Sequence, residues 1–453
     1  MSDDTGINDM PMRTTALKMD SHGKTRASVI AREVTPELMN AKTFGEIYIE
    51  LVKMKMNLLS LGVFDDVELT MDVPDFPTFN SSDVMVRVNV KESRPLRVGI
   101  QGSISTTGDD AGLEGSIDYL NVTGRADILS AHMRYDVLRK SILYSLNYRV
   151  PKGFFGNHIS VDYIKDYRNL IKESSVNSLN EGVVLNLTSP GGMIGLGYSF
   201  MWRDLSPAVD LDVERIMNSH CSKSIINECR PSIKSSIFST LTLDSRNSRV
   251  IPTAGSYAQL RLSYSGFLGD VNQFRTELRA NTNFAVSPAI FGEPGLALHL
   301  YGYGGFIRNL HRKKTRYFDR FFLTGENIRG YDMAEIGPRS APEEGGRKEG
   351  DVLGGDRCLS LGASLSFPIV FSKTPFGIRG QVFYNVGNVW NTNTSLKKAM
   401  NVALSSYGVG VMIPFGNVGR LEINYAMGRK RFNFLFCSNL RVSSNMLFTV
   451  FHT

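Results

Sequence analysis

Residues 359–367 read Leu-Ser-Leu-Gly-Ala-Ser-Leu-Ser-Phe, with an apolar side chain at every odd-numbered position and serine or glycine between them. Because successive side chains of a β-strand point to opposite faces, this stretch predicts a strand with one apolar face and one small polar face. The same period of two recurs at residues 142–148, 194–200 and 421–425. From Leu96 onward no helical period competes with it, so most of the chain is predicted to form β-sheet.

The alternating segments number sixteen, an even count of the kind found in single-chain membrane β-barrels. The alternation by itself leaves two architectures open. A soluble sandwich would bury the apolar face against a second sheet, whereas a membrane barrel would turn it toward lipid and the polar face toward a lumen. The expected strands lie near residues 96–105, 111–121, 125–136, 139–149, 157–166, 181–188, 193–202, 232–244, 256–265, 274–285, 296–307, 357–367, 376–386, 403–413, 418–427 and 441–451.

Composition excludes several classes of protein. The 453 residues are 42% hydrophobic and 21% charged, which is too apolar for a disordered chain. No uncharged apolar run reaches about 18 residues, so membrane helices are excluded, although a barrel has ordinary hydropathy because only alternate residues face lipid. The net charge of +7 is small for this length and predicts no nucleic-acid partner. The histidines and cysteines show no metal-ligand spacing and no catalytic motif is present, so we expect no metal, no cofactor and no enzymatic activity.

Residues 14–94 have a different pattern, that of a small α+β domain. A helix is expected over residues 43–61, where apolar residues recur at steps of three and four, and Gly62 stands where a C-terminal cap belongs. A shorter helix over residues 25–34 is expected to begin with Thr25 as its cap. Strands near residues 15–20, 67–73 and 84–91 complete the order β-α-α-β-β.

The longest connection, at about residues 308–356, contains the most specific local sequence, which ends in Ile328-Arg329-Gly330-Tyr331. In one interpretation its glycines are turn residues and Arg329 is solvated. In the other interpretation this segment forms a compact plug. Gly330 turns the backbone tightly, Tyr331 packs, and the guanidinium of Arg329 projects as a rigid five-donor fork. A connection this long inside a compact fold is usually functional or disordered.

Ile328-Arg329-Gly330-Tyr331 resembles the (Ile/Val)-Arg-Gly-(Phe/Tyr) motif in the sixth long loop of the POTRA-containing outer-membrane barrel-assembly superfamily. The flanking Asp319-Arg320-Phe321 and Ile336-Gly337-Pro338 resemble its mitochondrial branch, the barrel subunit of the sorting and assembly machinery. Further matches lie in order at residues 61–67, 244–248, 354–355, 383–388 and 420–425, so the resemblance covers about residues 14–430.

The resemblance implies a mostly β protein with three parts. These are a flexible N-terminus over residues 1–13, a single POTRA domain over residues 14–94, and a transmembrane β-barrel of about 16 antiparallel strands over residues 95–453. It also implies that the protein folds and inserts β-barrel precursors into the mitochondrial outer membrane, with the POTRA domain in the intermembrane space. The expected partners are β-barrel precursor proteins, peripheral sorting and assembly subunits, a cristae-organising complex and membrane lipid.

Other functions stay open at this point. They are a polypeptide-translocating channel of the same superfamily, a passive porin-like pore, and a soluble multi-sheet interaction protein. A pore has no need of the N-terminal domain or of the Arg-Gly-Tyr loop. The first residues lack the basic and apolar regions of a secretory signal, which favours the mitochondrial branch over the bacterial one.

The resemblance implies that the long loop folds into the lumen and that Arg329 holds it against the wall. The bacterial branch supplies acidic partners from the two following strands, whereas Ser366 and Asn385 occupy the matching places in this sequence. Asn385 can accept a hydrogen bond through its carbonyl oxygen, although a neutral acceptor gives a weaker bond than a carboxylate. Asp356 and Glu422 are further candidate partners, and the sequence does not rank them.

The resemblance also implies a lateral gate where the first and last strands meet, near residues 96–105 and 441–451. When such a seam opens, unpaired backbone N–H and C=O groups become available to the terminal strand of a precursor. The glycines of the first strand are equally well explained as bend residues of a barrel wall. The candidate gate residues are Leu96, Val98, Gly99, Ile100, Gly102 and Ile104.

Overall fold

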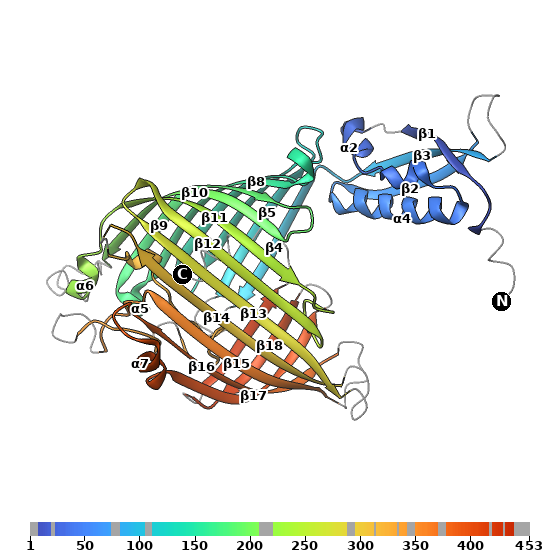
Figure 1. Cartoon of the computed structure of the whole chain (residues 1–453). Coiled ribbons are helices and arrows are strands. Elements are labelled where there is room, and N and C mark those ends of the chain that lie inside the picture. The colour runs from blue at the N-terminus through green and yellow to red at the C-terminus, as the bar shows by residue number, and fades with distance from the viewer. Residues whose placement is uncertain are drawn as a thin grey trace. The chain divides into compact units, whose positions relative to one another are not determined.

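The computed structural model describes residues 8–19, 23–73, 82–104, 111–207, 221–287, 295–311, 314–332, 335–341, 349–369, 377–415, 419–428 and 431–438. The chain divides into two compact units. The first comprises Met1–Gly99, Ser116–Ala131 and Leu146–Ile159, and the second comprises Ile100–Gly115, His132–Ser145 and Ser160–Thr453. Figure 1 labels the elements along the chain.

The N-terminal part of the first unit is a three-stranded sheet with helices. Its strands are β1 (Arg13–Met19), β2 (Phe64–Asp72) and β3 (Asp83–Glu92). They lie in the order β1-β3-β2, with β3 parallel to β1 and antiparallel to β2. The helices are α2 (Ala27–Ala31), α3 (Pro36–Asn40) and α4 (Phe44–Ser60). The three predicted strands and two predicted helices are therefore confirmed, and α3 is an additional short helix that begins with proline.

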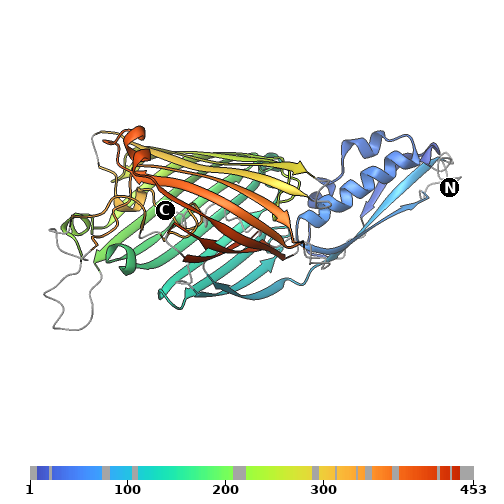
Figure 2. The same ribbon diagram turned by 90° about the horizontal axis from the view of Figure 1, so that it is seen from below.

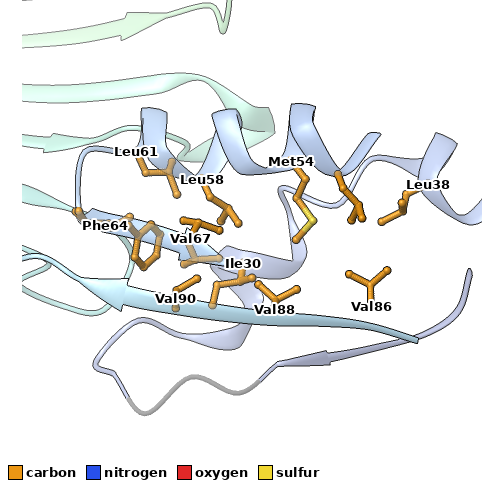
Figure 3. Packing of buried hydrophobic residues seen from close by; sticks show 14 of the residues in the cluster. Ile30, Leu38, Met54, Leu58, Leu61, Phe64, Val67, Val86, Val88 and Val90 are labelled. Atoms are coloured by element: carbon orange, nitrogen blue, oxygen red, sulfur yellow. The ribbon is translucent and has the colours of Figure 1, made fainter. Parts of the chain in front are cut away.

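The long helix α4 begins and ends where its sequence predicts. The Thr43 side chain accepts a hydrogen bond from the backbone N–H of Glu46, which satisfies one free donor of the first turn. Gly62 adopts a φ of +75° just after the last turn, a conformation that favours glycine. One face of α4 packs on the sheet, and Figure 3 shows Met54 and Leu58 against strand residues such as Val67 and Val88.

The predicted cap at Thr25 is wrong. Helix α2 begins after Arg26 and has no side-chain cap. The Thr25 hydroxyl and backbone N–H instead donate to the Glu92 carboxylate, at 2.5 and 2.6 Å. The Thr25 oxygen, which would accept the hydrogen bond of a cap, accepts instead from Nδ2 of Asn121 at 2.9 Å.

Sixteen strands form one sheet in simple chain order, from β4 to β19 (Figures 1 and 2). Every pairing whose register is described, from β9 to β19, is antiparallel. The protein is thus mostly β, with a barrel of antiparallel strands. The strands are β4 (Leu96–Ile104), β5 (Ala111–Leu120), β6 (Ile128–Asp136), β7 (Ser141–Val150), β8 (His158–Leu170), β9 (Val176–Thr188), β10 (Ile194–Pro207), β11 (Ser232–Asp244), β12 (Gly255–Gly269), β13 (Gln273–Ser287), β14 (Leu296–Asn309), β15 (Arg357–Pro368), β16 (Arg379–Trp390), β17 (Leu404–Phe415), β18 (Gly419–Ala426) and β19 (Arg431–Ser438).

The two faces of the large sheet differ as the alternation predicts. On β15, Leu361 and Leu365 are exposed, whereas Ser360 and Ser364, which each precede one of them, are buried. Exposed apolar side chains of this kind recur on most strands, and they suit a surface that faces lipid. Short helices occur in the connections, namely α5 (Ile171–Ser174), α6 (Lys223–Ile226) and α7 (Leu396–Asn401). In the described part of the chain, no helix is long and apolar enough to cross a membrane.

Strand β19 lies at residues that are not among the sixteen segments expected from the sequence. The structure places β19 at Arg431–Ser438, where it pairs with β18 from Ala426↔Arg431 to Gly419↔Ser438. Residues 431–438 contain phenylalanine at alternate positions, a strand pattern that directly follows β18 and so allows a tight hairpin. The predicted segment 441–451 lies outside the described residues.

We expect Leu58→Ala to destabilise the N-terminal sheet and helix layer by about 2–5 kcal/mol, because the fully buried side chain leaves a cavity between α4 and the sheet. Hydrogen–deuterium exchange of the full chain should show faster exchange of the β2 and β3 amides. Met56→Ala, on the exposed face of the same helix, is the matched control and should leave exchange unchanged. Equal exchange in the wild type and Leu58→Ala would contradict this packing.

Candidate functional site: the anchored loop between β14 and β15

The long connection between β14 and β15 packs against the inner face of the barrel wall. Its side chains Phe321, Leu323, Ile328, Tyr331 and Ile336 are all buried. They form one apolar cluster with residues of the neighbouring strands, which are Tyr303, Ile307, Cys358 and Val389. The loop is therefore held by a core of its own, as the plug interpretation predicts.

Arg329 is the charged centre of this loop. Its Nη2 and Nε donate to Oε2 of Glu422 on β18, at 2.9 and 3.2 Å. Its Nη1 donates to the hydroxyl of Tyr301 on β14. The guanidinium also lies 5.3 Å from the ring centroid of Tyr301 and 5.1 Å from that of Phe383 on β16. Arg329 is 6% exposed and Glu422 is fully buried, so the pair replaces part of the hydration that each charge loses.

Further hydrogen bonds hold the Glu422 carboxylate in place. Arg420 donates to Oε1 through Nε at 2.9 Å and makes an ion pair through Nη2 at 2.8 Å. Gln381 of β16 donates to Oε2 at 3.2 Å. A buried carboxylate needs this number of donors to offset the loss of water. The wall thus presents an ordered anion to the loop arginine.

Asn385, a predicted partner of Arg329, is linked to it through Tyr301. The Asn385 Nδ2 donates to the Tyr301 hydroxyl at 2.6 Å, and that hydroxyl accepts from Arg329. The tyrosine ring has space because Gly362 stands opposite it on β15, where a Cβ would lie 2.1 Å from a ring carbon. Two consecutive hydrogen bonds, from Asn385 to Tyr301 and from Arg329 to Tyr301, therefore replace the direct contact between Asn385 and Arg329 that the sequence suggests.

The other two predicted partners, Asp356 and Ser366, are not paired with the loop arginine. Asp356 lies before β15 and accepts from the hydroxyls of Thr315, at 2.5 Å, and Thr392, at 2.9 Å. Ser366 lies near the far end of β15 and shares a hydrogen bond of 2.8 Å with Nε2 of His299. The predictions that Asp356 and Ser366 bind Arg329 are therefore corrected. Strand register decides which wall residues reach the loop, and register cannot be read from local sequence.

The residues next to Arg329 fix its backbone. Gly330 has a φ of +84°, and a Cβ at this position would lie 2.4 Å from the Cβ of Ala426 on β18. Both the conformation and the space require glycine. Tyr331 is buried and its hydroxyl donates to the carbonyl of Ser405 on β17, at 3.1 Å. The tetrapeptide 328–331 therefore contacts the wall on both sides of the arginine.

Asp319 forms a second buried anchor, which the sequence analysis did not identify. It ends the short helix η3 (Tyr317–Asp319) and is fully buried. Arg203 of β10 binds its carboxylate through two nitrogens, at 3.0 and 3.3 Å, and Lys234 of β11 binds it at 2.5 Å. Arg275 of β13 donates to its backbone carbonyl at 2.6 Å. Burial raises the pKa of Asp319, but the charges of Arg203 and Lys234 outweigh burial and hold this pKa well below its usual range.

The predicted gate strand β4 is one end of the sheet, and β19 is the other. Leu96, Val98 and Ile100 are strongly exposed on β4. Gly99 is close to β5, since a Cβ there would lie 2.7 Å from the Ser116 hydroxyl. The remaining candidates, Gly102 and Ile104, belong to β4, but their side-chain surroundings are outside the described part of the structure.

Among the described residues, no group of three or more His, Cys, Asp or Glu side chains is placed to hold a metal ion.

A barrel with a loop pinned to its inner wall, preceded by a small α+β domain, defines a class of outer-membrane protein. Residues 121–436 match the model of the Omp85 superfamily domain, which covers well over half of the chain. The chain therefore belongs to the Omp85 superfamily.

Within that superfamily the chain is similar to the sorting and assembly machinery component 50 homologues. It is 27% identical to the Xenopus tropicalis protein over 421 residues, which cover 89% of this chain and 84% of the relative. It is 27% identical to the Homo sapiens protein over 425 residues, covering 90% and 84%. A SAM50-like protein of Schizosaccharomyces pombe is 25% identical over 449 residues, covering 92% and 86%.

Among solved structures, the fold is similar to that of BamA from Haemophilus ducreyi lacking POTRA domains 1–3. The TM-score is 0.73 at 17% identity, over 94% of this chain and 84% of that one. At this identity the similarity concerns the fold alone. It agrees with the barrel and with the POTRA-like N-terminal part predicted from the sequence.

We expect Asp319→Ala to release the start of the loop, because it leaves Arg203 and Lys234 buried without their carboxylate, at a cost of about 3–5 kcal/mol. Hydrogen–deuterium exchange of residues 314–332 should rise in the full chain while exchange of the mid-sheet strands stays low. Glu349→Ala removes an exposed carboxylate of the same loop and is the matched control. If Asp319→Ala protects residues 314–332 as well as the wild type does, Asp319 is not an anchor.

Proposed function

We propose that this protein folds and inserts β-barrel precursors into the outer membrane of mitochondria. The observation that carries the proposal is the Ile328–Tyr331 loop, pinned inside a barrel by the buried Arg329–Glu422 pair. Similarity to sorting and assembly machinery component 50 homologues along about nine-tenths of the chain supports the same function. No catalytic step is part of the proposal.

A loop fixed inside the lumen argues against a passive pore. Its apolar cluster and its two buried ion pairs occupy the inner face from β10 to β18. A diffusion channel gains nothing from filling its lumen, whereas a machine that opens its wall needs an inner support that keeps the remaining strands in place. The loop is suited to that role because it contacts several strands at once.

The proposed mechanism uses the two end strands of the sheet. An end strand carries unpaired backbone N–H and C=O groups, which are a template for another strand. Strand β19 is short, at eight residues, so a seam between it and β4 would need few hydrogen bonds to be broken. In this mechanism the terminal strand of a precursor pairs with β4 by strand addition and the new barrel grows from that edge.

The proposed cellular setting is supported by the similarity to the sorting and assembly machinery component 50 homologues. The barrel lies in the mitochondrial outer membrane and the N-terminal domain faces the intermembrane space. The proposed partners are β-barrel precursors, peripheral sorting and assembly subunits, a cristae-organising complex and the surrounding lipid. A polypeptide-translocating channel of the same superfamily is the competing function, and an assembly assay separates the two.

We expect Arg329→Ala to reduce assembly of a radiolabelled porin precursor in isolated mitochondria by about fivefold or more, because Glu422 then lies buried without its loop partner. Import of a matrix protein should continue at first. Arg339→Ala is the control, since Arg339 lies on the same loop and its ion pair is with the exposed Glu349. Normal porin assembly by Arg329→Ala would refute the role of the loop, and an equal loss of matrix import would favour the translocation channel.

We expect a photo-crosslinking amino acid at Val98 of β4 to capture the last strand of an arrested precursor. The same amino acid at Ile237 of β11 is the control, because Ile237 is also an exposed apolar residue but lies in the middle of the sheet. Mass spectrometry of the adduct identifies the precursor segment. The edge mechanism is excluded if no position along β4 gives an adduct, or if Ile237 gives the same adduct.

A further inference from the structure

An ion pair lies on the outer face of the large sheet, where the exposed side chains are mostly apolar. Lys165 of β8 and Glu181 of β9 form a salt bridge of 3.1 Å, and their side chains are 46% and 33% exposed. The Tyr163 hydroxyl donates to the same carboxylate at 2.6 Å. The pair is separate from both anchors of the loop, which lie on the inner face.

The alternation of burial shows that both charges face outward. Exposed and buried residues alternate along β8 from Ser160 to Tyr167, and Lys165 is one of the exposed ones. On β9, Val183 and Leu185 are exposed and share the phase of Glu181. Seven residues of β8 precede Lys165 and five follow it, and in β9 five precede Glu181 and seven follow it. The pair therefore lies near the middle of both strands, within the surface that suits lipid.

These charges are unfavourable against lipid and have capacity for another partner. A charge on the lipid-facing side of a barrel destabilises it, and the effect grows toward the middle of the wall. In the described structure Lys165 pairs with Glu181, and Glu181 accepts from Tyr163 as well. An ammonium group has three donors and a carboxylate has about four acceptor positions, so both groups are able to bind a second polar partner. Ionisable groups placed in this way mark a functional contact.

We propose that the outer face around Lys165 and Glu181 binds a second copy of this chain. Two copies inserted in the same direction are related by a two-fold axis along the membrane normal, and each contributes the same patch to the contact. An axis between β8 and β9 brings β8 of each copy opposite β9 of the other. Because the 3.1 Å salt bridge places the two charges at nearly the same depth, Lys165 of each copy then faces Glu181 of the other. The charge pattern is thus complementary to itself.

The surroundings of the pair also favour a second copy over lipid. Trp202 of β10 lies directly opposite Glu181 in the strand register and is exposed on the same face. Tyr167 and Val183 are exposed near the pair on β8 and β9. Large apolar side chains around a central polar group exclude water, which strengthens the charge interactions between copies. Acyl chains offer the two charges no partner, whereas a second copy supplies a matched pair by symmetry. The inference does not rest on the proposed role in barrel assembly.

Photo-crosslinking of the full chain in phosphatidylcholine vesicles tests the proposal. A photo-crosslinking amino acid replaces Val183, and the control replaces Val409 of β17, which is also exposed and apolar but lies on a distant strand. We expect at least about tenfold more covalent dimer from Val183, with residues 158–170 of the second copy in the adduct. Equal dimer yields at the two positions, or adducts with phospholipid alone, would overturn the proposal.

Charge reversal separates the contact between copies from the ion pair within one copy. Lys165→Glu leaves two negative charges at this position and Glu181→Lys leaves two positive ones. Each variant alone should lose the dimer captured at Val183 by about tenfold, because two like pairs then face each other. A mixture of the two variants should restore the dimer, since every acid of one faces a base of the other. A dimer that persists in either single variant, or that does not return in the mixture, would overturn the proposal.

A further double variant keeps the test decisive if charge reversal prevents folding. Lys165→Leu with Glu181→Leu gives this face the apolar character of β15, where Leu361 is exposed, so the barrel should fold and lose the dimer. Arg87→Gln with Asp72→Asn neutralises an exposed ion pair of the N-terminal domain and is the matched control that should keep it. Heat-modified gel mobility verifies that each barrel is folded. An undiminished dimer in the leucine double variant would refute the contact.

Discussion

The buried pair between Arg329 and Glu422 is the interaction on which the rest of the structure depends. Arg329 is buried and needs a counter-charge, and Glu422 supplies it where the wall strands meet, so docking of the loop depends on the wall around Glu422. The pair has a structural precondition, because Tyr301, Gln381 and Glu422 come from β14, β16 and β18 and meet only when these strands are in register. Loop docking is thereby coupled to correct pairing of the strands on both sides of the loop in the chain.

The two anchors have opposite polarity. At Asp319 the loop supplies the carboxylate and the wall supplies the cations, whereas at Arg329 the loop supplies the cation and the wall supplies the carboxylate. A reversed loop would place like charges together at both ends, which is strongly unfavourable at low dielectric. The direction in which the loop crosses the lumen is therefore fixed electrostatically, and the apolar cluster between the anchors adds stability without having to specify direction.

Features determined by neighbouring residues could be predicted from the sequence. The alternation of β15 and the periodicity of α4 are local, and both agree with the structure. Strand β19 at residues 431–438 was not expected from the sequence, because its pairing with β18 is visible only in the structure. The partner of Arg329 could be narrowed to four residues but not chosen, since register across several strands decides it. Asp319 belongs to a motif that carries the family resemblance, but its role as an anchor could not be predicted, because its cations come from three strands that are distant in sequence.

The small residues of the inner face, which at the sequence level are only the polar half of an alternation, have a specific role. A Cβ on Gly305 would lie 2.5 Å from the ring of Phe321, and one on Gly387 would lie 2.8 Å from the side chain of Ile328. Such contacts are too short for any other residue, so these glycines are the spaces into which the apolar side chains of the loop fit. The wall sequence therefore encodes the docked loop as well as the strand. A glycine-rich inner face is as much a requirement of the anchor as the ion pairs are.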